Sequence, residues 1–276
     1  MCPKLFQIGP FPIYSFGVML AIGFLAASYL LTEEFKRRKL NPDIAGTVTF
    51  LALVLGVAGS KLLHLIENWS SFVHDPIGMA FSPGGLTFHG GLILSIVGIA
   101  YYVRSKNIPF LLVADAASPG LILAYGIGRI GCHLAGDGDY GFPTTLPWGT
   151  DYSAGTYPPS AAFRNFPEIT SQFPNGIVPD SIACHPTPMY EFVLAAIIAL
   201  FLWRIRGRFS THGMLFSLYL ILSGLERFVV EFLRLNPKML LGLSQAQVIS
   251  VGLMIAGVAG YAYLRRFEHK EKVSDG

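Results

Sequence analysis

Charged residues are scarce in this chain of 276 amino acids. Lys, Arg, Asp and Glu together make up only 13% of it, whereas hydrophobic residues make up 52%. Soluble globular domains carry about 25% charged residues. With a mean hydropathy of +0.51, the composition indicates a membrane protein, and we expect no nucleic-acid partner.

Motifs of nucleotide-dependent and metal-dependent enzymes are missing as well. The sequence has no Walker A motif, no His-Glu-x-x-His and no Cys-x-x-Cys, which are signatures of phosphate loops, zinc proteases and redox or zinc sites. The stretch "GIGRIG" (126–131) is superficially similar to a dinucleotide-binding fingerprint. That fingerprint needs a strand–turn–helix context, which a membrane span does not offer. We therefore expect neither a cofactor nor a metal site.

Seven mostly apolar stretches approach or reach the 17–25 residues, roughly, that a membrane helix needs. No charged region with a small-residue cleavage site precedes the first stretch, so we expect no cleavable signal peptide. The fold class that we predict is an all-α polytopic membrane protein with seven transmembrane helices. The predicted spans are about 13–31, 44–66, 88–103, 111–134, 189–203, 212–233 and 245–264.

Lys and Arg are distributed unequally between the two sides of these spans. Thirteen of them follow the first, third, fifth and seventh spans, and only four lie in the opposite segments. Basic loops stay on the cytoplasmic side of a membrane. The sequence therefore predicts an N-terminus outside and a cytoplasmic C-terminus.

One long segment, at about 136–188, separates the fourth span from the fifth. It is rich in Pro, Gly, Tyr, Phe and Asn and has no helical periodicity. Loops of this length in compact proteins tend to be functional or disordered, and aromatic residues favour the membrane interface. We predict an ordered outer cap at 136–188, inserted in a single membrane domain of residues 1–276, and a site that opens outward.

Three basic residues lie inside predicted spans: Lys61, Arg129 and Arg227. A charge near the middle of the bilayer costs about 2.5–3.5 kcal/mol on insertion scales, so such residues usually face protein or water. For Lys61, near the outer end of its span, snorkelling or a structural ion pair is as good an interpretation as a functional role. Arg129 and Arg227 have polar companions, which favours a functional role for both.

Polar residues gather at the outer ends of four spans. Any of them alone is compatible with a structural role, but two arginines together suit a phosphate, because the guanidinium group binds it bidentately and stays charged. The groups are His89 in "GGLTFHGG", Arg129 with His133, then His185, Tyr190 and Glu191 in "ACHPTPMYE", and Arg227, Glu231 and Arg234 at helical spacing.

The residues alone therefore indicate a membrane enzyme or transporter that acts on an anionic lipid from the outer leaflet. A transporter would use the arginines and carboxylates as an anion or proton path, and it predicts inverted repeats and polar groups at mid-membrane. The sequence shows neither. A lipid-binding protein without catalytic activity would keep the arginines but would not need His89.

Four motifs in order resemble those of bacterial prolipoprotein diacylglyceryl transferases, and the resemblance covers essentially the whole chain. "FHGGL" is similar to the family's His-Gly-Gly element, and "GRIGCHLAGDGDYG" to its signature G-R-x-G-N-F-x-N-G-E-x-x-G. "HPTPMYE" resembles its His-Pro-Ser-Gln-Leu-Tyr-Glu element, and "RFVVEFLR" its Arg-Phe-x-x-Glu-Phe-x-Arg element. "YSFGVMLAIGF" in the first span also matches.

The resemblance implies a transferase of the bacterial cytoplasmic (inner) membrane, active toward the outer leaflet. Such an enzyme moves the diacylglyceryl group of phosphatidylglycerol to the lipobox cysteine of a prolipoprotein signal peptide, and it releases glycerol phosphate. Arg129 would grip the lipid phosphate, Arg227 would stabilise the departing phosphate, and His89 would accept the thiol proton. The residues implied in headgroup binding are Arg129, Arg227, Asp137, Asp139, Glu231, Gly141, Tyr14, Phe16, His185 and Glu191.

The chain departs from the family pattern at several polar positions. Cys132 and Ala135 stand at the two asparagines of the signature, and Ser223 stands at a tyrosine upstream of Arg227. Phe16 replaces a tyrosine of the first span, although Tyr14 lies two residues earlier. These changes are compatible with a divergent branch of the same activity or with a paralogue that uses another lipid or acceptor.

Cys132 and Cys184 both lie toward the predicted outer face, where the environment is oxidising. Either a disulfide or free thiols are possible there. We expect a disulfide that would tie the cap to the fourth span.

Overall fold

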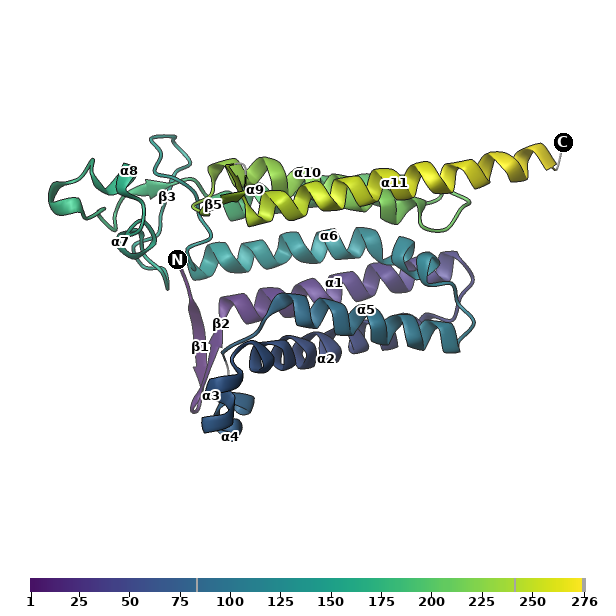
Figure 1. Ribbon diagram of the computed structural model, residues 1–276, viewed down its shortest axis with the longest axis horizontal. Coiled ribbons are helices and arrows are strands. Elements are labelled where there is room, and N and C mark those ends of the chain that lie inside the picture. Colours follow the sequence, from purple (N-terminus) through teal and green to yellow (C-terminus); the bar gives the residue numbers. More distant parts are fainter. Residues whose placement is uncertain (83, 241, 275–276) are drawn as a thin grey trace. The chain divides into compact units, whose positions relative to one another are not determined.

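Long helices dominate the computed structural model, which describes residues 1–82, 84–240 and 242–274, apart from the side chains of Leu240 and of residues 267–274 (Figure 1). The chain forms two units, one of Met1–Ala27 with Ala117–Gly276 and one of Ser28–Ala116.

The seven predicted spans all contain a helix. These helices are α1 (Ser15–Arg37), α2 (Pro42–Glu67), α5 (Phe88–Ser105), α6 (Phe110–Ala135), α9 (Thr187–Ile205), α10 (Met214–Val230) and α11 (Gln245–Ser274). Five of the described helices, α1, α2, α6, α9 and the Gln245–Arg266 part of α11, are long and apolar enough to cross a membrane. The chain is therefore a largely helical protein with several candidate membrane spans.

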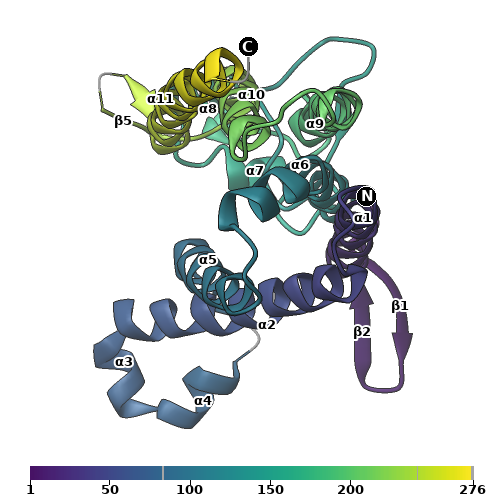
Figure 2. The same ribbon diagram turned by 90° about the vertical axis from the view of Figure 1, so that its right-hand side faces the viewer.

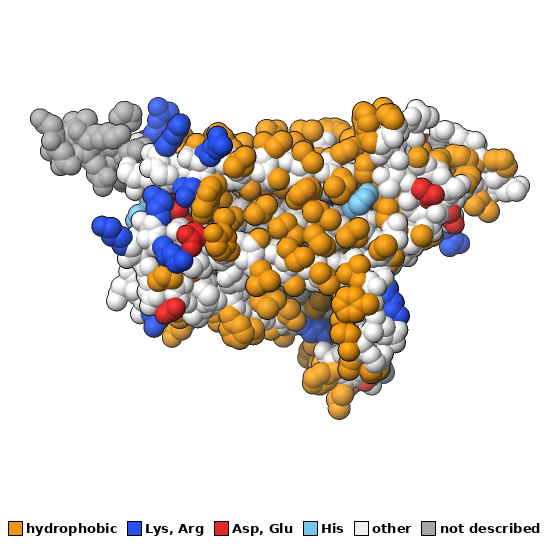
Figure 3. Space-filling model, turned by 180° about the vertical axis from the view of Figure 1, so that it is seen from behind, with side chains coloured by type: hydrophobic (Ala, Val, Ile, Leu, Met, Phe, Trp, Pro, Cys, Tyr) orange, Lys and Arg blue, Asp and Glu red, His pale blue; other side chains and the backbone are white. Residues whose placement is uncertain are grey.

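The larger unit is built around α6, α9, α10 and α11. Ile122 of α6 packs with Ala195, Ala199 and Leu202 of α9 and with Leu215 of α10. Gly224 and Gly257 let α10 and α11 approach closely, as small residues do in membrane helices. Apolar side chains cover much of the face in Figure 3, while Lys and Arg gather mainly where helices end. This distribution suits helices that contact lipid.

The segment between α6 and α9 is an ordered cap with a hydrophobic core of its own. Tyr140, Tyr152, Phe163 and Cys184 are all buried in that core, which explains the many aromatic residues of the segment. Its elements are β3 (Thr150–Asp151), α7 (Pro159–Ala162), α8 (Pro167–Thr170), η1 (Pro174–Gly176) and β4 (Ala183–Cys184), and β3 pairs with β4 (Figure 1).

Short strands elsewhere depart from the predicted all-α fold. An antiparallel hairpin of β1 (Lys4–Ile8) and β2 (Phe11–Tyr14) precedes α1, so Tyr14 ends a strand and does not lie within a helix. A second hairpin, β5 (Lys238–Leu240) with β6 (Leu243–Ser244), precedes α11. These pairs are too short, and too close to apolar spans, to show a strand periodicity in the sequence.

The end of α10 also differs from the prediction. The predicted span ran to residue 233, but the α-helix ends at Val230 and a single 3₁₀ turn, η2 (Glu231–Leu233), follows it. Arg234 has extended backbone angles. Arg227, Glu231 and Arg234 therefore do not form one continuous helical stripe.

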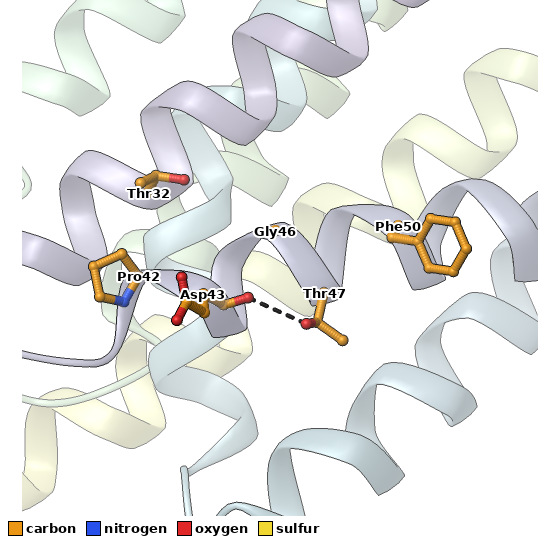
Figure 4. A pocket seen from close by; sticks show the side chains of 6 residues that line it. All are labelled: Thr32, Pro42, Asp43, Gly46, Thr47 and Phe50. Carbon is orange, nitrogen blue, oxygen red and sulfur yellow. Dashed lines mark hydrogen bonds between the residues drawn. The ribbon is translucent and has the colours of Figure 1, made fainter.

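In the smaller unit, α2 and α5 lie side by side, with α3 (Trp69–His74) and α4 (Pro76–Phe81) beyond the end of α2 (Figure 2). Gly59 of α2 and Gly90 of α5 meet backbone to backbone. A hollow of about 550 Å³ is lined by Thr32, Pro42, Asp43, Gly46, Thr47 and Phe50 (Figure 4). It contains none of the residues that the sequence singles out.

Candidate functional site

The stretch from Tyr125 to Gly141 ends α6 and turns back toward it. α6 closes at Ala135, and Gly136 follows with a φ of +57°. Glycine adopts this left-handed conformation without steric cost, which makes it a common helix terminator. The reversal brings Asp139 to an ion pair with Arg129, ten residues earlier on the helix.

Glu191, in the first turns of α9, lies at the centre of three arginines. Its carboxylate is fully buried, and Arg129 Nε lies 3.0 Å from Oε2. Arg227 Nη1 lies 2.5 Å from Oε1 and Arg234 Nη1 lies 3.5 Å from Oε2. The Tyr125 hydroxyl also donates to Oε1, at 3.1 Å. A buried carboxylate needs such partners, because an unpaired charge in the interior is costly.

Glu231 is the second buried carboxylate of the cluster. Arg227 Nη2 lies 2.8 Å from its Oε2. Its Oε1 accepts hydrogen bonds from Asn236 Nδ2 and from Ser244 Oγ, each at 2.6 Å. The two hydrogen bonds to Oε1 hold the Glu231 carboxylate in place, and Oε2 orients Arg227.

Asp139 is the third carboxylate, and it pairs with both Arg129 and Arg234. Burial raises the pKa of Asp139, but the two arginines outweigh that effect and hold the pKa below its usual value. For neighbouring Asp137, burial and the negative charge of Asp139 raise the pKa. Two carboxyl groups two residues apart thus have opposite tendencies to ionise.

The cluster therefore contains three arginines and three carboxylates, Arg129, Arg227, Arg234, Asp139, Glu191 and Glu231. The side chains of Arg129 and Arg227 remain 19% and 20% exposed, whereas Arg234 is only 7% exposed. The carboxylates of Glu191 and Glu231 are fully enclosed. An anion that approaches the cluster can consequently reach Arg129 and Arg227, whose guanidinium groups the buried carboxylates hold in place.

Gly141 joins the cap to the cluster through its backbone. Its N–H donates to the His185 carbonyl at 2.9 Å, and it forms an isolated bridge with Arg234. A Cβ at this position would lie 2.9 Å from Thr187 Cγ2 and 3.1 Å from His185 Cβ. The chain needs a glycine here because two other segments pass too close for a side chain.

The two histidines nearest the cluster in sequence have partners outside it. His133 Nδ1 is 2.9 Å from the Tyr152 hydroxyl of the cap. His185 Nδ1 is 3.3 Å from the Tyr190 hydroxyl, and burial lowers the pKa of His185. Both imidazoles contact a tyrosine rather than a guanidinium group, which suits a role in attaching the cap.

The expected disulfide between Cys132 and Cys184 does not form. Both residues are free and buried. Cys184 packs in the core of the cap, and burial raises the pKa of its thiol to about 12. Cys132 lies instead beside Arg129, with Sγ 3.9 Å from Nη1. The disulfide prediction was wrong because each thiol packs among different partners.

Cys132, Asp137 and Asp139 bring one potential ligand atom each to within 4.8 Å of one another. Both carboxylate oxygens of Asp139 already pair with arginines. A divalent cation prefers several oxygen ligands with free lone pairs, and two adjacent guanidinium charges would repel it. The donor set does not suit a metal.

His89 belongs to the smaller unit. It lies in the first turn of α5 with an exposed side chain, and its ring meets Phe88 edge to face at 5.9 Å. Lys61, in the same unit, donates to Ser82 O, Ser82 Oγ and Gly84 O at 2.8–3.0 Å. These hydrogen bonds favour the structural interpretation of Lys61 over the functional one.

Tyr14 and Phe16 lie at the junction of β2 and α1 in the larger unit, and both are exposed. Gly131 of α6 packs against Phe16, whose Cα would be 3.2 Å from a Cβ at that glycine. Phe16 therefore contacts α6 at the residue before Cys132, about one helical turn before α6 ends at Ala135.

Sequence reasoning missed three supports of the cluster, Tyr125, Asn236 and Ser244, and it named Arg234 without giving it a place in the site. Arg234 is part of the "RFVVEFLR" motif, so a third arginine could have been inferred from it. Ser244 and Gln247 form a capping box, with Ser244 N to Gln247 Oε1 at 3.0 Å and Gln247 N to Ser244 Oγ at 3.3 Å. The sequence "SQAQ" signals that helix start, but not its contact with Glu231.

Comparison with known proteins shows that the chain is similar to a family of transferases. A family model described as prolipoprotein diacylglyceryl transferase matches residues 3–263. A phosphatidylglycerol–prolipoprotein diacylglyceryl transferase of Clostridium tetani is 33% identical over 259 residues, which are 94% of this chain and 96% of the relative. A relative in Clostridium perfringens whose name differs only by a final numeral 2 is 31% identical, over 90% of this chain and 90% of the relative. A relative of the same name in Dehalococcoides mccartyi is also 31% identical, over 99% of this chain and 97% of the relative.

Proposed function

The chain belongs to the prolipoprotein diacylglyceryl transferase family, and we propose on this basis that it transfers the diacylglyceryl group of phosphatidylglycerol to the lipobox cysteine of a prolipoprotein. A carbon–sulfur bond forms and the carbon–oxygen bond to the phosphate breaks. The electron pair of that bond leaves with glycerol phosphate. The product is a thioether, and the reaction is the first step of lipoprotein maturation.

The observation that carries the site assignment is the partial exposure of Arg129 and Arg227 above enclosed carboxylates. The lipid phosphate would lie between the two guanidinium groups and replace part of their contact with Glu191. Bidentate binding favours arginine over lysine for this purpose. As the phosphate departs it gains negative charge, which fixed arginines stabilise without reorganisation.

Glu191, Glu231 and Asp139 hold the arginines in place and do not contact the reacting atoms in this proposal. Asp137, Tyr14 and Phe16 contribute to the surroundings of the headgroup, and Gly141 and His185 shape the junction with the cap. Each of the two arginines retains one carboxylate partner when the phosphate replaces the other. The guanidinium planes therefore keep their orientation during binding.

The thiol must lose its proton before it attacks, because the thiolate is the nucleophilic form. His89 is our candidate for the group that takes this proton. Its imidazole is exposed, and histidine is the side chain that most often accepts a proton in catalysis near neutral pH. The proton then passes from the imidazole to solvent.

The proposed setting is a bacterial cytoplasmic membrane, crossed by all seven long helices as a single domain of residues 1–276. The basic segments after α1, α5, α9 and α11 favour a cytoplasmic C-terminus. The N-terminus and the cap, 136–188, then lie outside, and the site opens toward the outer leaflet. No cofactor enters the reaction.

Transfer of lipid from radiolabelled phosphatidylglycerol to a lipobox peptide by the purified protein tests this function. We expect labelling by the wild type, near-complete loss in Arg129→Lys, and normal labelling in Arg164→Lys, whose arginine is exposed in the cap. Labelling by Arg129→Lys at the wild-type rate would contradict the phosphate-binding role. A protein that binds the lipid but labels no peptide would support a lipid-binding or transport function instead.

A further inference from the structure

Glu226 is a fourth carboxyl group beside the arginine cluster, and one of its oxygens is buried without a hydrogen-bond partner among the residues that the structure describes. It immediately precedes Arg227 on α10, and only 5% of it is exposed. Its Oε1 is enclosed and accepts no hydrogen bond from any residue that the structure describes. Glu191 and Glu231, in contrast, each contact at least two arginines.

The face of α10 that carries Glu226 points into the larger unit. Leu215, Tyr219 and Leu222 pack against the core that α6 and α9 share, and Glu226 follows Leu222 and Tyr219 at four and seven residues. Residues at this spacing lie on one helix face. Gly224, on the opposite face, contacts α11.

Ionisable groups surround Glu226 from several elements. Tyr125 and Arg129 of α6, Glu191 of α9, Arg227 of α10 itself, and Arg234 after η2 are all close enough for their charges to act on its carboxyl group. The three arginines already balance Asp139, Glu191 and Glu231. An ionised Glu226 would therefore leave the cluster with an excess negative charge in an enclosed, apolar place, where an unpaired carboxylate is strongly disfavoured.

We propose that Glu226 is a neutral carboxylic acid which sets the charge of the arginine cluster, so that binding of the anionic lipid phosphate is linked to the proton on Glu226. Protonated, it adds no charge to a cluster whose arginines and carboxylates balance, and a phosphodiester can then replace part of the contact between the arginines and Glu191. Ionised, it adds a negative charge that repels the same ligand. This inference rests on the proposed phosphate site between Arg129 and Arg227.

Linkage between the two binding events is reciprocal. If the proton on Glu226 favours the lipid, the bound lipid must favour the proton equally. Lipid affinity should therefore fall at alkaline pH by roughly 10-fold, within the range of typical coupling between sites. The phosphodiester of phosphatidylglycerol keeps one negative charge throughout the neutral and alkaline range, so the pH dependence reports on the protein.

The test measures binding of radiolabelled phosphatidylglycerol to the purified, detergent-solubilised full chain between about pH 6 and about pH 9.5, a range that lies well above the usual pKa of a carboxyl group in water. We compare the wild type with Glu226→Gln, a neutral side chain of the same shape, and with Glu67→Gln. Glu67 is exposed, belongs to the smaller unit, and accepts a hydrogen bond from Thr87.

We expect the wild type and Glu67→Gln to lose affinity as the pH rises, while Glu226→Gln binds with the neutral-pH affinity of the wild type across the range. The same pH profile in Glu226→Gln as in the wild type would overturn the inference. So would loss of binding or of folding in Glu226→Gln, because a neutral side chain is what the inference requires. A wild type that binds no phosphatidylglycerol at any pH would contradict the proposed phosphate site itself.

Discussion

Ser244 donates a hydrogen bond of 2.6 Å to Oε1 of Glu231 and so connects the first turn of α11 to the carboxylate that pairs with Arg227. The same hydroxyl accepts from Gln247 N as the N-cap of α11. One side chain therefore both begins a helix and positions a member of the arginine cluster.

Ser244→Ala should lower both stability and transfer. Loss of the N-cap costs about 1 kcal/mol of stability, and Glu231 loses one of two hydrogen bonds that fix its orientation. Ser244→Thr keeps the hydroxyl and should restore most of both properties. Thermal unfolding and peptide labelling would be measured on each variant. If alanine lowered stability but left kcat unchanged, Ser244 would have no part in positioning Glu231.

His89→Ala should leave binding of phosphatidylglycerol largely intact while transfer falls by roughly 10²–10⁴-fold, the usual contribution of a general base. Raising the pH toward the pKa of the thiol should recover part of the rate, since the thiolate then forms unaided. The measurement is lipid binding and transfer from about pH 6 to about pH 9.5 on a folded variant. Unchanged transfer in His89→Ala would exclude the general-base role.

Asp137 and Asp139 should influence the acid stability of the protein in opposite directions. The pKa of Asp139 is lower in the folded protein than in the unfolded chain, so its stabilising effect is present at neutral pH and disappears as the pH falls through the folded pKa. Asp139→Asn should therefore lower the melting temperature at about pH 7, where the ionised carboxylate stabilises the folded protein fully. The variant should also lose less stability than the wild type when the pH is lowered.

The pKa of Asp137 is raised by folding, so its ionisation opposes folding once the pH exceeds the unfolded pKa, and Asp137→Asn should raise the melting temperature at neutral pH. Thermal unfolding of the two variants and the wild type between about pH 3 and about pH 7 checks both signs. Melting temperatures that shift in the same direction in the two variants would contradict the opposite effects assigned to Asp137 and Asp139.

Gly141→Ala should destabilise the junction between the cap and the cluster. The added Cβ would come within 3.1 Å of two side chains and also meet the Leu233 carbonyl. An overpacked site of this kind typically costs about 1–3 kcal/mol. Gly128→Ala in α6 is the matched control, because its added Cβ would meet no atom of another segment within 4 Å among the residues that the structure describes. Similar unfolding temperatures for the two variants would show that the junction accommodates the added methyl group without loss of stability, which would contradict the prediction.

The sequence predicted the helices well and their termini less well. Long apolar runs locate α2, α6 and α9 to within two residues, because lipid and a dry core both require continuous hydrophobicity. The end of α10 was misplaced, since Glu231 and Arg234 keep a helical spacing although the backbone has already left the helix. Short hairpins such as β1–β2 carry no periodicity long enough to detect.

The cluster itself was predicted in part. Ionisable residues are costly within apolar spans, so their presence there indicates a specific role. This signal identified Arg129, Arg227, Glu191 and Glu231. The contacts of Arg234 and Ser244 depend on tertiary packing, and a sequence gives no distance between residues so far apart. The disulfide prediction failed for the same reason. Two cysteines on the same side of a membrane can still be too far apart to form a bond.

The state of the three cysteines has a practical consequence. Cys132 and Cys184 are buried, while Cys2 is exposed. The cap keeps its shape by packing aromatic rings and not by a covalent bridge, so reducing buffers should leave it folded. A maleimide fluorophore applied to the native protein should therefore attach at Cys2 alone, beside the β1–β2 hairpin. The unaltered chain thus offers one optical reporter at its N-terminal end, without removal of any other thiol.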